Sequence, residues 1–381
     1  MALTDTIEIK PVSSKEDLDT FIRLPFRVFE DDPAWIPPLI LERRDHLNPK
    51  KNPYFQHADV QLFIALRNGS CVGRISAQIC QMHQARYGDD VGQFGFLDAI
   101  DDAQVFAALL NAAESWTKER GMKALRGPFS FSINEESGLL VDGFDTPPTI
   151  MMNHAKPYYG GHVEAAGFAK AMDLLAYYYD ANMEMSRGLK SMVKKVEQSG
   201  DLVIRPLNKK KFDEELEIII SIFNDAWSDN WGFVPMTEAE VSHLGQMLKL
   251  LVTGEYAAIA EYEGKPAAMC VTLPNVNEAI ADLNGKLLPV GWAKLLWRLK
   301  LKAPNSVRMP LMGVAKEHQT TPVGAALAIG VIDAIRAYHS GRGTRWAELS
   351  WILETNEPTR NIVKAVGGKE YKTYRVYERA L

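Results

Sequence analysis

The sequence predicts an α/β (α+β) protein made of two tandem copies of one unit, each a mixed, mostly antiparallel sheet flanked by helices. Two stretches, 59–80 and 255–275, alternate apolar and polar residues around a short turn, which is typical of β-hairpins. Residues 309–381 read as strand, helix, strand, helix and strand, and a strand–helix–strand crossover of this length places its strands parallel. The polar, basic residues 186–200 separate the two copies as a linker.

The first copy is expected over residues 1–185. Its hairpin turns at Asn68-Gly69, a pair favoured in two-residue hairpin turns, and its long helix ends at Gly121. The strands, helices and hairpin of this copy are predicted, in order, at 7–11, 14–28, 59–80, 92–97, 103–121 and 123–129.

The second copy is expected over residues 201–381. It follows a similar plan, in which a strand and two helices precede the hairpin, and the crossover closes the chain. Its elements are predicted, in order, at 203–206, 212–226, 238–251, 255–275, 309–315, 327–340 and 346–354, with a helix from Pro358 and a last strand at 370–381.

The bulk composition excludes several protein classes. The chain has 381 residues, of which 46% are hydrophobic and 24% charged, which is typical of a globular protein with large cores. The formal net charge of −5 argues against general nucleic-acid binding. Cys71, Cys80 and Cys270 lack metal-ligand spacing, so we expect buried thiols in a reducing cytoplasm and no metal. Neither a signal peptide nor a membrane-spanning run is expected.

The turn after strand 309–315 is a candidate phosphate-binding site. The start of a helix presents backbone N–H groups and a positive dipole end, which suit a pyrophosphate. Pro322 lacks an N–H group and cannot donate a hydrogen bond to a phosphate. The missing hydrogen bond would weaken phosphate binding by about 0.5–1.5 kcal/mol. The alternative is an ordinary strand–helix turn with Pro322 near its first position. The matching turn of the first copy carries Asp98, Asp101 and Asp102, which repel phosphate, so the second copy is the better site.

These features resemble the GNAT acyltransferase superfamily, in which a Gln/Arg-x-x-Gly-x-Gly/Ala signature surrounds the pyrophosphate of acyl-CoA. Residues 319–324 occupy those six positions, with Pro322 where the first glycine is expected. The resemblance implies that acyl-CoA is the acyl donor. It implies a coenzyme site formed by Val314, Gln319, Thr320, Thr321, Val323, Gly324 and Ala325.

Longer strings across nearly the whole chain are similar to one bacterial branch of tandem GNAT-like proteins, which includes ceramide synthases. They are NPYFQHADVQLFIA, RGPFSFSINEESGLLVDGFDTPPTIMM, PYYGGHVEAAGFAKAMDLLAYYYD, FNDAWSDNWGFVPMTEAE and ELSWILETN. The resemblance implies transfer of a long-chain acyl group to the amine of 3-oxosphinganine or sphinganine. The alternatives are transfer to another small amine or an aminoacyl acceptor, and a non-catalytic lipid-binding role.

Acyl transfer to an amine requires a general base, because an amine with a pKa of about 10 is neutral in fewer than about one molecule per thousand at pH 7. Glu354 lies at the carboxyl end of its strand, where open α/β sheets bind ligands, and is one base candidate. Asn356 is a candidate orienting group, although it equally suits capping the next helix.

The first copy has its own candidates. Glu135 is a second possible base, next to Asn134 in the acidic turn 132–138, and the alternative is a solvated turn. His154 with Tyr158 or Tyr159 is a candidate proton relay, although a lone histidine is more often structural.

Further candidates lie in the second copy. Tyr374 is positioned to protonate the leaving thiolate, unless it is a packed strand residue. Trp231 and Phe233, in a polar loop, are candidates for binding the acceptor, and core packing is the alternative for them. Tyr158 of the first copy is a further candidate for binding the acceptor.

Residues 285–304 combine two features of helices that lie on membrane surfaces. Trp292 and leucines share one face of the predicted helix, and lysines and arginine occupy another. We therefore expect a cytoplasmic protein that contacts the inner face of the membrane through 285–304, with Trp292 near the lipid substrate. The alternative is a helix packed on its own domain with its basic edge in water.

Overall fold

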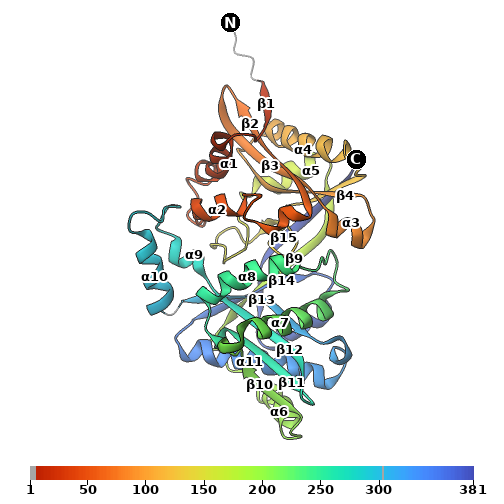
Figure 1. Ribbon diagram of the computed structural model, residues 1–381, viewed down its shortest axis with the longest axis vertical. Coiled ribbons are helices and arrows are strands. Elements are labelled where there is room, and N and C mark those ends of the chain that lie inside the picture. The colour runs from red at the N-terminus through yellow and green to blue at the C-terminus, as the bar shows by residue number, and fades with distance from the viewer. Residues whose placement is uncertain (1–5, 303) are drawn as a thin grey trace. The chain divides into compact units, whose positions relative to one another are not determined.

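The computed structural model describes residues 6–302 and 304–381 (Figure 1). The chain forms two compact units, and the first contains the residues up to 174 together with 280–291 and 372–381. The remaining residues, 175–279 and 292–371, form the second unit. The chain passes from one unit to the other within β9 (Ala169–Asp180) and β15 (Lys369–Ala380). Residues 187–197 form helix α6, and the sequence-based domain boundaries stay a prediction.

The first unit contains a mixed sheet with the strand order β1, β2, β3, β4, β5 and the end of β15. Neighbouring strands are antiparallel except β4 and β5, which are parallel, so the predicted mostly antiparallel sheet is confirmed. Asn68 and Gly69 both have positive φ, 51° and 79°, as a type I′ hairpin turn requires. The strand bounds are Ile7–Pro11, Ala58–Arg67, Ser70–Cys80, Val91–Ala99 and Ala124–Gly127, followed by β6 Phe129–Ser130, β7 Glu136–Ser137 and β8 Leu139–Asp142.

Helices cover both faces of this sheet. A Cβ on Gly73 of β3 would lie 2.6 Å from Leu109 Cδ1 in α4 (Ala103–Lys118), so this face packs closely against α4. The next residue, Arg74, donates to a main-chain carbonyl of α1 (Lys15–Val28). Because successive residues of a strand point to opposite faces, α4 and α1 lie on opposite sides of the sheet. The other helices are α2 Ile40–His46, η1 Pro53–Gln56, α3 Gln81–Tyr87 and α5 Tyr158–Ala165.

The second unit contains a sheet with the strand order β10, β11, β12, β13, β14. The first three pairs are antiparallel, and β13 and β14 are parallel, which confirms the predicted crossover. The crossover helix, α11, starts earlier than the predicted residue 327, at Pro322. The strand bounds are Leu202–Pro206, Ala257–Tyr262, Lys265–Pro274, Ser306–Val314 and Trp346–Leu353.

The sheet of the second unit is also covered on both faces. Met269 and Val271 of β12 belong to a buried cluster with the apolar side of α7 (Phe212–Trp227). Thr272 instead bonds to His339 of α11 (Pro322–Gly341), so α7 and α11 lie on opposite faces. The other helices are α6 Arg187–Glu197, η2 Lys209–Lys211, α8 Glu238–Leu251, η3 Gly254–Tyr256, α9 Val276–Ile280, α10 Gly291–Leu301, η4 Lys316–His318 and α12 Glu357–Ala365.

In both units the parallel pairing begins at the start of the two strands and ends well before β4, β13 and β14 end. The β13–β14 ladder joins Ser306–Met309 to Trp346–Leu349, and the β4–β5 ladder covers three residues of each strand. In the first unit, the chain after β5 then approaches β4 closely, since a Cβ on Gly95 would lie 1.9 Å from the Phe129 carbonyl oxygen. This approach fixes the start of the acidic turn that follows.

No helix within residues 6–302 and 304–381 combines the length and the apolar composition that crossing a bilayer requires.

Candidate functional site

The predicted coenzyme turn joins β13 to α11. Thr321 caps the helix, because its Oγ1 accepts from the Gly324 N–H at 3.0 Å while donating to the His318 carbonyl at 2.8 Å. The Ala325 N–H donates to the Thr321 carbonyl at 3.2 Å, and Pro322 has no N–H group. In the first turn of α11, the Gly324 and Ala325 N–H groups thus donate to Thr321, and the Val323 N–H does not.

The two residues that match the GNAT signature hold this turn in shape. Gln319 Nε2 donates to the Val314 carbonyl at 2.9 Å and to a carbonyl at the end of α7 at 3.2 Å. Gly324 is buried, and a Cβ there would lie 2.0 Å from the His318 carbonyl oxygen, so only glycine fits. Thr320 is exposed. The bonds of the Gln319 side chain and the lack of space for a Cβ at Gly324 therefore explain both matches to the signature without a ligand.

A diphosphate would find a mixed environment at this turn. The positive end of the α11 dipole and the Val323 N–H favour an anion. Lys316 lies beside it, but its Nζ is 2.6 Å from Asp229, and its N–H donates to Asp225. Binding through the Gly324 amide would also displace the Thr321 cap, and a cap is worth about 1 kcal/mol. The turn fits a diphosphate only after the Thr321 hydroxyl moves.

Glu354 and Asn356 follow β14, as predicted, and have different surroundings. The Glu354 carbonyl accepts from Arg360 Nη1 at 2.6 Å, which fastens the strand end to α12. Asn356 Oδ1 accepts from the Thr359 N–H at 3.1 Å. Asn356 is therefore the N-cap of α12, the alternative role expected from its sequence position.

The proposed relay residues of the first unit bond to groups other than one another. His154 Nε2 lies 3.1 Å from Asp32 Oδ2, and burial lowers the pKa of His154 even with that carboxylate beside it. The Tyr158 hydroxyl donates to a main-chain carbonyl at the end of β4 at 2.8 Å. The Tyr159 hydroxyl donates to Asp98 at 3.2 Å. A proton relay through these residues stays a prediction.

The remaining candidates are spread over several elements. Tyr374 is fully buried in β15, opposite Leu140 of β8. Phe233 belongs to the core of the second unit, while Trp231 is half-buried. Trp292 is exposed on α10. The substrate contacts expected of these residues stay predictions.

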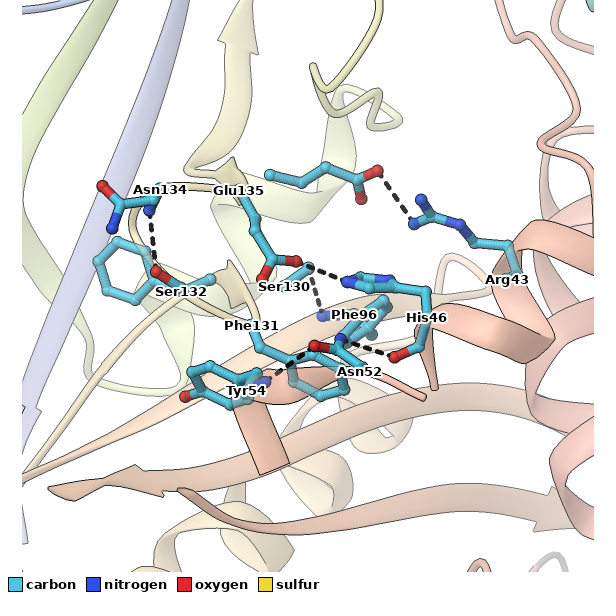
Figure 2. Close-up of polar contacts among 12 residues, drawn as sticks. Arg43, His46, Asn52, Tyr54, Phe96, Ser130, Phe131, Ser132, Asn134 and Glu135 are labelled. Carbon is cyan, nitrogen blue, oxygen red and sulfur yellow. Dashed lines mark hydrogen bonds and ion pairs between the residues drawn. The ribbon is translucent and has the colours of Figure 1, made fainter. Parts of the chain in front are cut away.

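The acidic turn of the first unit brings distant residues together (Figure 2). It connects β6 to β7, and the Asn134 N–H donates to Ser132 Oγ at 3.0 Å within it. Glu135 points from this turn toward α2, where its Oε2 lies 2.5 Å from His46 Nε2. Asn52 holds His46 in place, because its side chain donates to the His46 carbonyl at 2.8 Å.

A second ion pair lies beside the first. Arg43, one helical turn before His46, contacts Glu136 at 3.0 Å and forms two bonds with Glu42, at 2.5 and 2.9 Å. Three carboxylates thus face one guanidinium and one imidazole, so the group stays net negative whether or not His46 is protonated. Such a group attracts a cation and repels a polyanion such as CoA.

The His46 ring lies among aromatic side chains. Its centroid is 5.8 Å from that of Phe96 and 5.3 Å from that of Phe131, which is fully buried. Burial alone would lower the pKa of His46, but the Glu135 carboxylate outweighs it and raises the pKa above its usual value of 6.5. Among the described residues, His46 Nδ1 is buried and has no hydrogen-bond partner.

The sequence analysis named Glu135 as a candidate base and did not name His46, its partner in the structure. The available signal was the spacing of Arg43 and His46, three residues apart, which places both on one face of a helix if that short segment is helical. Nothing in the spacing identifies a carboxylate 89 positions later as the partner of His46. Within the described ranges, no group of three or more His, Cys, Asp or Glu side chains is arranged to hold a metal.

Comparisons with known proteins show the family to which the chain belongs. No family model matches the chain. Protein YghO of Escherichia coli (strain K12) is 47% identical over 374 residues, which cover 98% of this chain and 95% of YghO. A bacterial ceramide synthase of Caulobacter vibrioides is 49% identical over 376 residues, 98% of each chain.

Solved structures share the fold at low sequence identity. A tandem GNAT protein from the clavulanic acid biosynthesis pathway has a TM-score of 0.57 at 13% identity, with 98% of each chain covered. A GCN5-related N-acetyltransferase from Sphaerobacter thermophilus has a TM-score of 0.53 at 12% identity and covers 100% of this chain and 97% of its own. The chain therefore has the fold of tandem GNAT proteins and belongs to the family of the bacterial ceramide synthase of C. vibrioides and of protein YghO.

Proposed function

We propose that the protein is an acyl-CoA-dependent N-acyltransferase that transfers a long-chain fatty acyl group to the amine of 3-oxosphinganine or sphinganine and forms a (3-oxo)ceramide. The observation that carries this proposal is the 49% identity to a bacterial ceramide synthase over 98% of both chains. The GNAT fold of both units and the cation-attracting group around Glu135 agree with it. Acyl-CoA would supply the activated acyl group as a thioester.

The turn at the start of α11 is our proposed coenzyme site. The helix dipole and the Val323 N–H would face the diphosphate, and the Thr321 hydroxyl would move off the Gly324 N–H. Val314, Gln319 and the neighbouring main chain would hold the loop in shape. Glu354 and Glu135 are the two base candidates for the amine.

The decisive assay combines the purified full chain with palmitoyl-CoA and 3-oxosphinganine or sphinganine. We expect thiol release and ceramide formation in equal amounts, measured with a thiol reagent and by lipid mass spectrometry. A reaction without amine measures background hydrolysis. Thiol release with small amines alone would favour the other acceptors. Absence of both turnover and coenzyme binding would favour a lipid-binding role and contradict the proposal.

We also propose that α10 contacts the surface of the membrane that holds the lipid substrate. Trp292, Leu296 and Trp297 are 52%, 49% and 56% exposed on this helix, whereas Leu299 is half-buried. Arg298 donates to the Ala279 carbonyl at 2.6 Å, which ties the other side of α10 to the protein. The exposed face of α10 thus carries two tryptophans, whereas the predicted face carried one. Leu295 and Leu299 are half-buried against the protein.

The chemistry of this face favours a lipid surface. Large exposed apolar side chains on one helix mark an interaction site, and Trp292, Leu296 and Trp297 are of this kind. Lys294 is exposed on the same helix, and tryptophan with lysine suits an anionic headgroup region. A sphingoid substrate is itself held in a bilayer, so surface attachment would bring the enzyme to it.

Flotation with vesicles of phosphatidylethanolamine and phosphatidylglycerol tests the contact. We expect the wild type to float with these vesicles and the variant Trp292→Ala/Trp297→Ala to stay largely in the dense fraction. Trp116→Ala, in α4 of the first unit, is the control for loss of a tryptophan elsewhere. Equal flotation of the double variant and the wild type would remove the proposal.

A further inference from the structure

The Glu135–His46 pair has a definite orientation. The Glu135 side chain is 27% exposed and the His46 side chain 13%, so the carboxylate is the outer member and the imidazole the inner one. Figure 2 shows the Glu135 carboxylate between its own turn and the His46 ring. A substrate that approaches from solvent would meet Glu135 first.

We propose that Glu135 is the catalytic carboxylate that binds the ammonium group of the amine acceptor, and that His46 behind it holds the proton taken from that group. This inference rests on the proposed N-acyltransferase function. Glu135 would contact the substrate directly. His46 would act through Glu135 and is therefore a positioning and proton-holding residue.

The need for a second group follows from the acidities. A carboxyl group has an ordinary pKa of about 4.3, about six units below the pKa of about 10 of an alkylammonium group. In a carboxylate–ammonium contact the proton therefore lies on the carboxylate in only about one case per million. An imidazole with a pKa of about 6.5 reduces this pKa difference to fewer than about four units, and the pKa of His46 is raised above 6.5. The histidine makes neutral amine about a hundredfold or more accessible than Glu135 would alone.

The proton balance of the step is complete. The ammonium group gives one proton to Glu135, which passes it to His46 Nε2, the nitrogen that carries no hydrogen when the ring is neutral with its hydrogen on Nδ1. The pair changes from carboxylate–imidazole to carboxylate–imidazolium. The neutral nitrogen attacks the thioester carbonyl, the C–N bond forms and the C–S bond breaks. The nitrogen loses its second proton as the intermediate collapses, and the departing thiolate takes up one proton. One proton is released overall, with amide and free thiol as products.

The charged groups around His46 agree with this role. Glu135 comes from the β6–β7 turn, Glu136 from β7, and Arg43 and Glu42 from α2 itself. Glu136 and Glu42 both pair with Arg43, which stays charged, whereas Glu135 pairs with His46, which can exchange a proton near neutral pH. The Phe96 and Phe131 rings lie beside the imidazole, which is 13% exposed, and a low local dielectric strengthens the pairing.

Variants separate this role from a structural one. Glu135→Gln removes the carboxylate, and His46→Gln keeps an amide donor near the position of Nε2 but cannot take up a proton. The matched control is His83→Gln, which removes another buried histidine of the first unit that faces a carboxylate, Asp89 at 3.0 Å. Each protein is assayed with palmitoyl-CoA and sphinganine from pH 5.5 to 9.5, and circular dichroism confirms that it is folded.

For the wild type we expect kcat/KM to rise with pH through an apparent pKa above 6.5. Both variants should lose about 10²–10⁴-fold in kcat/KM, and His46→Gln should lose the rising limb near neutral pH. His83→Gln should keep the wild-type profile. A His46→Gln variant with the wild-type rate and profile would overturn the inference while leaving the proposed function intact.

A second measurement decides the inference even if turnover is absent. The imidazole of His46 is titrated by NMR with and without sphinganine in detergent micelles, and its signal is assigned by its loss in His46→Gln. We expect a pKa above 6.5 in the free protein and a change on adding sphinganine that Glu135→Gln abolishes. A wild type that turns over no sphingoid amine contradicts the proposed function. A His46 titration that sphinganine leaves unchanged contradicts the pair.

Discussion

His339 links the stability of the second unit to pH. It lies in α11, the helix that begins at the proposed coenzyme turn, and is 2% exposed. Its Nε2 is 2.9 Å from Thr272 Oγ1, and its ring is 4.8 Å from that of Tyr256. Burial, assisted by Arg342, lowers the pKa of His339 to about 4. The folded unit therefore keeps this imidazole neutral at pH values where an unfolded chain protonates it.

The sign and size of the effect follow from linkage. The pKa in the unfolded chain is about 6.5, so below that value the unfolded state binds the proton first. Stability from neutral His339 is fully present above pH 6.5 and is lost as the pH falls toward 4. The free energy of unfolding falls by about 2 kcal/mol at pH 5 relative to pH 8, and by about 3 kcal/mol below pH 4. These values follow from about 1.36 kcal/mol for each unit of pKa shift.

Thermal melting of wild type and His339→Gln at pH 8 and pH 5 measures this term. Glutamine can keep a bond to Thr272 but does not titrate. For a unit of this size, about 2 kcal/mol corresponds to about 4–8 °C in Tm. Between pH 8 and pH 5, the Tm of the wild type should therefore fall by about 4–8 °C more than the Tm of His339→Gln. His243→Gln, at an exposed position of α8, should behave as the wild type. Equal losses in wild type and His339→Gln would refute the reasoning.

Two further predictions concern the second unit. Pro322→Ala adds an N–H group at the first position of α11, so the Kd for CoA by calorimetry should fall about 2–10-fold, as one added hydrogen bond allows. Unchanged or weaker binding would argue against a diphosphate at this helix end. Asn356→Ala removes the α12 cap and should cost about 1 kcal/mol in thermal melting, while Asn356→Asp, which also caps, should not. An equal loss in both variants would contradict the capping role.

The sequence alone determined the local structure and the family. Alternation with period two predicted both hairpins, and Asn68-Gly69 predicted the turn between β2 and β3. The polar residues before Pro322 and the apolar helix after it predicted the β13–α11–β14 crossover. These features are readable because they depend on neighbours within one or two turns of the chain.

The tertiary structure decided which side chains meet. The sheet order brings the turn after β6 against α2 and so pairs Glu135 with His46, 89 positions away in the sequence. It also assigns residues 280–291 and 372–381 to the first unit, and it half-buries Leu295 and Leu299 of α10. At the proposed coenzyme turn, the Gly324 N–H donates to Thr321 Oγ1. Long-range partners are set by strand order and side-chain packing across the fold, and no local spacing records them.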